Sequence, residues 1–201
     1  MIHADQPGCI IRRANPGDAR SIAAIHIQSW RETYPGIVPD EILARQSLDD
    51  REMAWAQILL GGPPHHKFTF VAEDATKSVC GFASGGAFRR DPESESSPPG
   101  VDLGRFDGEL HAIYVLQAQQ KKGLGAGLFR AVRRELISQG YQSMFVWVLE
   151  RNASRAFYER MGGVAMASKR IKIGVWMEEK GYGWERLDSM SQRFGEEGAV
   201  R

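Results

Sequence analysis

The residues best suited to chemistry in this sequence gather around a glycine-rich turn. An apolar run, 110–116, leads into it, and a helical pattern with an apolar residue at every fourth position follows it. Glycine lets the backbone come close to a phosphate, and the first amides of a helix favour an anion. The turn therefore predicts a phosphate site, built by Gln120, Lys121, Lys122, Gly123, Leu124, Gly125, Ala126 and Gly127.

The spacing of the glycines restricts the ligand. A dinucleotide fingerprint would place its third glycine one residue later than Gly127, and a Walker loop would end in Gly-Lys-Ser or Gly-Lys-Thr, which is absent. The pattern that remains is Q-x-x-G-x-G, from Gln120 to Gly125. Glycines at a turn between a strand and a helix also occur for the turn alone. This pattern by itself therefore leaves both interpretations open.

A second stretch makes the first more specific. The apolar run 143–149 is followed by N-x-x-x-x-F-Y-x-x-x-G, which begins at Asn152 and ends at Gly162. The two motifs, in this order, resemble the GCN5-related N-acetyltransferase superfamily, the acyl-CoA-dependent amine acetyltransferases. The opening at 11–16 is also similar to that family, so the resemblance covers most of residues 9–165.

The resemblance implies acetyl-CoA as co-substrate. The turn at 120–127 would hold the pyrophosphate, and the edge of the preceding strand would pair with the pantetheine arm. Asn152 would bind that arm in addition to capping the next helix. Beyond the turn, the residues expected at the cofactor are Ile113, Tyr114, Val115, Asn152, Phe157 and Tyr158.

Acetyl transfer also needs an acid for the departing thiolate. The resemblance assigns this role to Tyr158, a phenol with an ordinary pKa of about 10. The alternative is a core aromatic residue. Adjacent helix positions point about 100° apart, so Phe157 and Tyr158 cannot both face the core centrally. We expect Phe157 in the core and Tyr158 in the site.

A base is needed if the amine arrives protonated, and Glu109 and His111 are the candidates. By strand alternation they share a face with Ile113 and Val115, although a bulge would change that phase. Both could also be ordinary strand residues. Glu150 is a third option, unless it pairs with Arg151 or Arg155.

The acceptor site is expected between the first helices and the far side of the sheet. Trp30 and Tyr34, and the Tyr182–Trp184 pair, are aromatic residues that could line it, although core packing would explain Trp30 equally well. The sequence departs from the family at Gly163, where a phenylalanine is usual. We expect a packing hole or a freer backbone there. His65 and His66 have no partner residues at metal-binding spacing, so no metal is predicted.

Composition excludes several classes of protein. The chain has 201 residues, 42% hydrophobic and 25% charged, with a net charge of +1. These values are typical of a globular protein and give no basic face for nucleic acid. The sequence predicts neither a signal peptide nor a membrane-spanning run of about 18 apolar residues, so a cytoplasmic location is expected. Cys9 and Cys80 are predicted to be buried, reduced thiols.

The elements predict an α+β fold, with a central, mixed, mostly antiparallel twisted sheet flanked by helices. A single domain is expected over 9–187, with flexible termini at 1–8 and 188–201. The loop at 89–104 is expected to be a solvated connector or a lid. The helix after Asn15, with Pro16 next, has a capped start. After the last motif, strands are expected at 164–169 and 171–177, and 182–184 could close the sheet.

The predicted function is transfer of an acetyl group from acetyl-CoA to a primary amine by direct attack. The acceptor, a small molecule or a peptide, is left open. A non-catalytic acyl-CoA sensor is the alternative, and an enzyme of another class that binds a nucleotide at the same turn is a weaker one. No membrane partner is expected, and an exposed sheet edge makes a homodimer possible.

Overall fold

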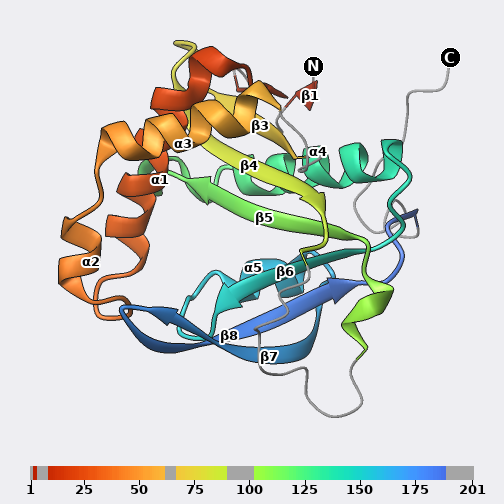
Figure 1. Ribbon diagram of the computed structural model, residues 1–201. Coiled ribbons are helices and arrows are strands. Elements are labelled where there is room, and N and C mark those ends of the chain that lie inside the picture. The colour runs from red at the N-terminus through yellow and green to blue at the C-terminus, as the bar shows by residue number, and fades with distance from the viewer. Residues whose placement is uncertain (1, 4–8, 62–66, 90–101, 189–201) are drawn as a thin grey trace, which may run out of the picture.

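The computed structural model describes residues 2–3, 9–61, 67–89 and 102–188. Its strands form one sheet in the order β1-β2-β3-β4-β5-β6-β8-β7 (Figure 1). The strands are β1 (Ile2–His3), β2 (Ile10–Arg13), β3 (Phe68–Glu73), β4 (Val79–Ala87), β5 (Gly108–Val115), β6 (Met144–Leu149), β7 (Val164–Ile173) and β8 (Val175–Trp184). The helices are α1 (Ala19–Thr33), α2 (Asp40–Ala44), α3 (Leu48–Leu60), α4 (Leu124–Ser138) and α5 (Arg155–Arg160), with 3-10 turns at Pro16–Asp18, Leu103–Arg105 and Gln117–Gln119.

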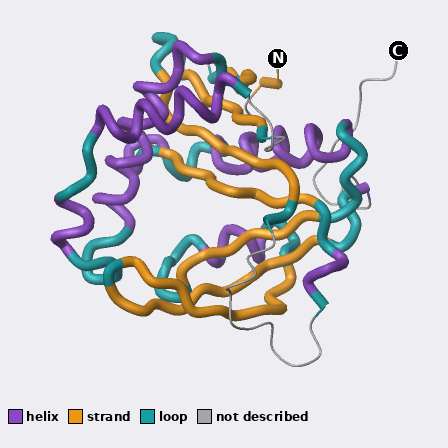
Figure 2. The backbone as a smooth tube through the Cα atoms, in the orientation of Figure 1, coloured by secondary structure: helices purple, strands orange, loops and turns teal. Residues whose placement is uncertain are grey.

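The predicted sheet is confirmed as mixed and mostly antiparallel. Among the described strands, only β5 and β6 pair in parallel. The strands form one layer (Figure 2), with α4 and α5 against one face and α1 and α3 against the other. No described helix is long and apolar enough to cross a membrane. The predicted 89–104 loop, the flexible termini and the His65–His66 pair lie wholly or largely outside the described residues.

The C-terminal strands differ from the prediction. The chain does not break near residue 170 but continues to Ile173, turns at Gly174 with a φ of 71°, and returns as β8. The tip of this hairpin lies against α2, because a Cβ on Gly174 would be 2.9 Å from Ile42 Cδ1. The β7–β8 hairpin and α2 thus close one side of the molecule together (Figure 1).

The predicted packing hole at Gly163 is also absent. A Cβ there would lie 2.7 Å from the ring of Trp184, which fills the space. Trp184 Nε1 donates to the carbonyl oxygen of Met161 at 2.8 Å. Trp184 and Tyr182 belong to the core on the α4 side, so the prediction that they line the acceptor site is wrong. The β8 register places their side chains on the opposite face of the sheet.

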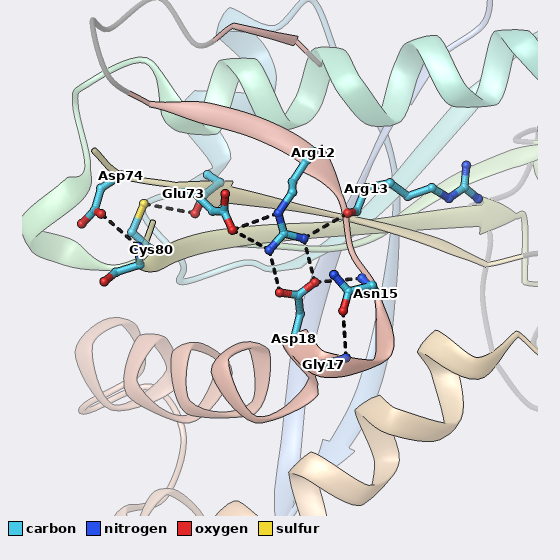
Figure 3. A network of polar contacts seen from close by, with 10 residues as sticks. Arg12, Arg13, Asn15, Gly17, Asp18, Glu73, Asp74 and Cys80 are labelled. Carbon is cyan, nitrogen blue, oxygen red and sulfur yellow. Dashed lines mark hydrogen bonds and ion pairs between the residues drawn. The ribbon is translucent and has the colours of Figure 1, made fainter. Parts of the chain in front are cut away.

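Arg12 in β2 ties three segments together at the start of α1 (Figure 3). Its guanidinium donates to both carboxylate oxygens of Asp18 at 2.8 Å, and its Nε donates to Glu73 at 2.9 Å. Asp18 also accepts from the Asn15 N–H at 2.8 Å, which confirms the predicted capped start. Burial alone would raise the pKa of Asp18, but hydrogen bonds from Arg12 and Asn15 lower it overall.

Replacing Arg12 by Gln leaves the Asp18 carboxylate buried without its countercharge. We expect the free energy of unfolding at neutral pH to fall by about 1–3 kcal/mol. The folded-state pKa of Asp18 is lowered, so the stabilisation from this pair is present above the unfolded pKa and is lost as pH falls through the folded one. The difference in free energy of unfolding between wild type and Arg12→Gln should therefore become smaller as the pH is lowered to about 3.

Urea denaturation at both pH values measures this difference. The matched control is Arg13→Gln, because Arg13 is exposed and its ion pair with Glu135 lies on the surface. We expect the control to change stability by less than about 0.5 kcal/mol. An equal loss for Arg12→Gln at both pH values would contradict this assignment.

Candidate active site

Strands β5 and β6 lie side by side at one end and separate at the other (Figure 1). β5 pairs with β4 along its whole length, whereas it pairs with β6 only at Gly108↔Met144 and Glu109↔Phe145. On the β6 side, residues 110–115 therefore carry backbone groups that no described strand pairs with. An extended ligand that carries amide groups can add to such an edge as a further strand. Ile113, Tyr114 and Val115 lie on this edge.

The sequence placed Glu109 and His111 on one face of this strand with Ile113 and Val115. A bulge makes that prediction wrong, because the register with β4 shifts and leaves His111 as an extra residue. Beyond the bulge, Ile113 and Val115 pack on the α4 side, in the core that also holds Leu110. Glu109 is adjacent to Leu110 and therefore points to the other face, towards α1. One inserted residue reverses the alternation after it.

The glycine turn opens α4 with backbone N–H groups that have no partner in the helix. Gly123 is the N-cap with a φ of 80°, and Lys121 has a φ of 59°, so both adopt left-handed conformations. The first helical N–H to bond inside α4 is that of Gly127, which donates to Gly123 O at 2.9 Å. Such an end is an anion site. The free amides in its first turn belong to Leu124, Gly125 and Ala126.

The surroundings of the turn explain its other residues. Gln120 Nε2 donates to the carbonyl oxygen of the last residue of β5 at 3.0 Å, which ties the turn to the open strand edge. A Cβ on Gly125 would lie 3.6 Å from the ring of Phe157, so that ring borders the turn. Gly127 has a packing role: a Cβ there would lie 2.5 Å from Ile11 Cδ1, and its absence lets α4 approach β2.

Three tyrosine side chains from different elements lie close together at the end of β5 that has diverged from β6. Tyr34 follows α1, Tyr114 lies in β5 and Tyr158 lies in α5. Trp30 Nε1 donates to Tyr114 Oη at 3.0 Å, and the hydroxyls of Tyr34 and Tyr114 are close enough that each shifts the pKa of the other. Asn152 Nδ2 donates to Tyr34 Oη at 3.3 Å. Burial, and then the proximity of Tyr114, raises the pKa of Tyr158.

Sequence reasoning thus selected residues that the fold brings together. Tyr34, expected at the acceptor side, is a member of this cluster, and Trp30, expected there too, donates to the hydroxyl of Tyr114. The expected capping role of Asn152 is wrong, because α5 begins two residues later with Ser154 as its N-cap; Asn152 Oδ1 instead accepts from the Ser154 N–H at 2.8 Å in the turn before the helix. Glu150 does not take either of its expected partners but pairs with Lys180 at 3.1 Å.

The burial of Phe157 and Tyr158 is the reverse of the prediction. Phe157 is half-buried and packs edge-on against Phe129 at the start of α4, with 6.1 Å between ring centroids. Tyr158 is buried and lies 6.0 Å from the ring of Tyr182. The short α5 directs Tyr158 beneath the sheet and Phe157 towards the glycine turn. The Tyr158 hydroxyl makes no hydrogen bond to any residue in the described part of the chain, so it can donate to a ligand.

Glu109 and His111 are close together, with 3.9 Å between His111 Nε2 and Glu109 Oε2. The Glu109 side chain is 2% exposed, and it is held by Arg89 through the backbone N–H at 2.8 Å and through the guanidinium. His111 Nε2 donates to Ala87 O at 3.2 Å. Burial lowers the pKa of His111 to about 4, so its ring is neutral, and its Nδ1 is buried with no described partner.

Residues on β6, β7 and β8 complete the same face, and sequence reasoning missed them. A side chain on Gly181 would collide with the rings of Phe145 and Trp147, so this glycine lets both rings lie across β8. Lys169 Nζ lies 4.6 Å from the centre of the Trp147 ring and 3.6 Å from a carboxylate oxygen of Glu179. The charged run at 178–180 has the pattern of a solvated turn, and only the strand pairing reveals which of its residues point inwards.

Comparison with known proteins agrees with this geometry. Residues 103–171 match the family model of FR47-like proteins. The chain is 36% identical over 181 residues to the uncharacterized N-acetyltransferase YuaI of Bacillus subtilis, covering 90% of this chain and 95% of that protein. It is 28% identical over 157 residues to the probable N-acetyltransferase Rv2775 of Mycobacterium tuberculosis, covering 75% and 76%.

Solved structures share the fold. An N-acetyltransferase from Staphylococcus aureus Mu50 superposes with a TM-score of 0.63 at 23% identity, covering 90% of this chain and 99% of that one. The putative acetyltransferase yncA of Salmonella typhimurium, solved with acetyl-CoA, gives 0.62 at 24% identity, covering 97% and 98%. With its open strand edge and its glycine turn, the chain belongs to the GCN5-related N-acetyltransferase superfamily, the acyl-CoA-dependent N-acetyltransferases.

Proposed function

We propose that this N-acetyltransferase moves the acetyl group of acetyl-CoA directly onto a primary amine. The observation that carries the proposal is the separation of β5 from β6 next to the free amides of α4. The pyrophosphate would lie on those amides, and the pantetheine arm would pair with the open edge of β5. A cofactor bound in this way would have its thioester near the tyrosine cluster. A backbone N–H of residues 113–115 would bind the thioester oxygen as negative charge develops on it.

The transfer then needs two proton movements. A neutral amine attacks the thioester carbon, and collapse of the tetrahedral intermediate breaks the C–S bond. Tyr158 gives its proton to the departing thiolate, and the phenol regains a proton from the new ammonium group of the intermediate, directly or through water. Burial keeps Tyr158 protonated, because its pKa is raised. No covalent enzyme intermediate is required.

Binding of acetyl-CoA is tested by thermal shift with acetyl-CoA, CoA, ATP and NADPH in turn. At a ligand concentration of about 100 Kd the stabilisation is about 2.7 kcal/mol, or about 5 °C or more in Tm. We expect only the two CoA species to stabilise the protein. Gly125→Asp should abolish the shift, because a carboxylate would stand among the phosphate-binding amides. ATP or NADPH stabilising equally well would contradict the proposal.

The matched control is Gly125→Ala. Its Cβ would make an ordinary contact with Phe157 at 3.6 Å and adds no charge, so the protein should remain folded and keep most of the shift. If Gly125→Asp also retains the shift from acetyl-CoA, the turn does not hold the pyrophosphate.

Replacing Tyr158 by Phe tests the acid. We expect kcat, measured by thiol release with an amine acceptor, to fall about 100-fold, because the thiolate departs without a proton. The shift in Tm caused by acetyl-CoA should remain. Tyr182→Phe is the control, since that buried hydroxyl bonds Glu159 at 2.9 Å on the core side. Full activity of Tyr158→Phe would exclude Tyr158 as the acid. If wild type binds acetyl-CoA but releases no thiol, the alternative function of a non-catalytic acyl-CoA sensor is favoured.

A further inference from the structure

Glu179 is a carboxylate that points into the face where the acceptor amine must approach. It pairs with Leu149 of β6 on one side and with Lys169 of β7 on the other. Directly paired residues in neighbouring strands point to the same face. Leu149 packs against Tyr34 on that face, so Glu179 points there too. Its side chain is only 12% exposed, although its residue type is normally found at the surface.

Charged and titratable groups from three elements surround this carboxylate. Lys169 of β7 lies 3.6 Å away, longer than a direct charge-assisted hydrogen bond. Arg89, which follows β4, and Glu109, in β5, are close enough to influence its titration. Tyr114, also in β5, in turn responds to the charge of Glu179. Glu179 thus lies within electrostatic reach of the tyrosine cluster.

The electrostatic environment leaves Glu179 suited to accepting a proton. Burial raises its pKa more than Lys169 lowers it, and the net shift is upwards. A carboxylate with a raised pKa is a stronger base than an ordinary glutamate. Among the described aspartates and glutamates with a resolved shift, Glu179 is the one whose pKa is raised rather than lowered.

The two bases expected from the sequence, Glu109 and His111, are less able to accept a proton, because their polar atoms are already bonded or buried. Both oxygens of Glu109 accept hydrogen bonds from Arg89, and a proton would have to displace them. His111 is a bulge residue that uses Nε2 on Ala87 O, and its Nδ1 is buried. Among the described residues, the side chain of Glu179 pairs with Lys169, and the Lys169 ammonium also lies over the Trp147 ring.

We propose that Glu179 is the carboxylate that takes the proton from the ammonium group of the acceptor. This role rests on the proposed function, transfer to an amine. The ammonium N–H gives its proton to Glu179, which passes it to solvent, and the neutral amine attacks the thioester. The second amine proton replaces the one that Tyr158 gave to the thiolate. One proton is released in total for each amide formed.

The role of Lys169 follows from its position. It supplies a positive charge that keeps Glu179 ionised when the acceptor arrives, and its place over the Trp147 ring holds the ammonium to one side of the carboxylate. Removing that charge should raise the pKa of Glu179 further. Lys169 is therefore a positioning residue, and it sets the pH at which the base becomes available.

The test compares Glu179→Gln with wild type in thiol release from acetyl-CoA, with spermidine, ethanolamine and glycylglycine as probe acceptors. We expect kcat/KM for the fastest probe to fall about 100-fold near neutral pH, and the defect to shrink as rising pH deprotonates the amine in solution. The acetyl-CoA shift in Tm should be unchanged. Glu178→Gln is the matched control, since Glu178 is the neighbouring residue on β8, is half exposed and pairs with Arg170.

The pH profile separates a base from a structural ion pair. Below its pKa, protonated Glu179 cannot accept a proton, so wild-type activity should fall as pH falls. Lys169→Met should move this acid limb to higher pH, because the lost cation lowered the pKa of Glu179. Lys169→Arg keeps the positive charge and should return the acid limb of the pH–activity profile to its wild-type position. Unchanged activity of Glu179→Gln, or an acid limb that Lys169→Met leaves in place, would overturn the proposal.

Two further measurements keep the test decisive. If Glu179→Gln does not fold, Glu179→Asp retains the carboxylate and should keep more activity than Glu179→Ala; equal loss in both contradicts the proposal. Carboxyl 13C NMR of Glu179 needs no acceptor, and titration at or below the usual value of about 4.3 overturns the proposal. Wild type that binds acetyl-CoA but acetylates no probe would instead count against the proposed function.

Discussion

The structure depends on the short length over which β5 and β6 are paired. Two residues of each strand align in parallel, and the strands then diverge. Unpaired backbone groups inside a sheet are costly unless something else satisfies them. The divergence therefore needs both a support that holds the strands apart and a ligand that can use the exposed edge. The other features of the site follow from these two needs.

The support comes from both ends of the chain. Tyr34 at the end of α1 accepts a hydrogen bond from Asn152 beyond β6 and packs in one cluster with Tyr114 of β5, so it lies between the two separated strands. The β7–β8 hairpin packs its tip on α2 and closes the same side. Where β5 ends, Gln120 ties the open edge to the glycine turn. The free amides of α4 and the open edge of β5 are thus held at a fixed spacing, as the proposed binding of a long anionic thioester requires.

The sequence predicted this half of the site because its signals are local. A glycine turn before a helix has consequences that do not depend on distant packing, whereas the burial of Tyr158 depends on its contact with Tyr182 of β8. The faces of β5 and β8 depend on distant packing. The bulge at His111 is fixed by pairing with β4, and the inward position of Glu179 by pairing with β6 and β7. Trp184 likewise fills the space at Gly163 from the last position of β8, which no local pattern indicates.

The most direct measurement is hydrogen exchange of the backbone amides with and without saturating acetyl-CoA. The account predicts slower exchange in two separate segments, residues 110–115 on the open edge of β5 and residues 124–126 in the first turn of α4, because the ligand would bond both. ATP at the same concentration should leave 110–115 unchanged. Protection confined to other parts of the chain, or to the turn alone, would contradict the claim that the divergence of β5 from β6 is the site of the cofactor arm.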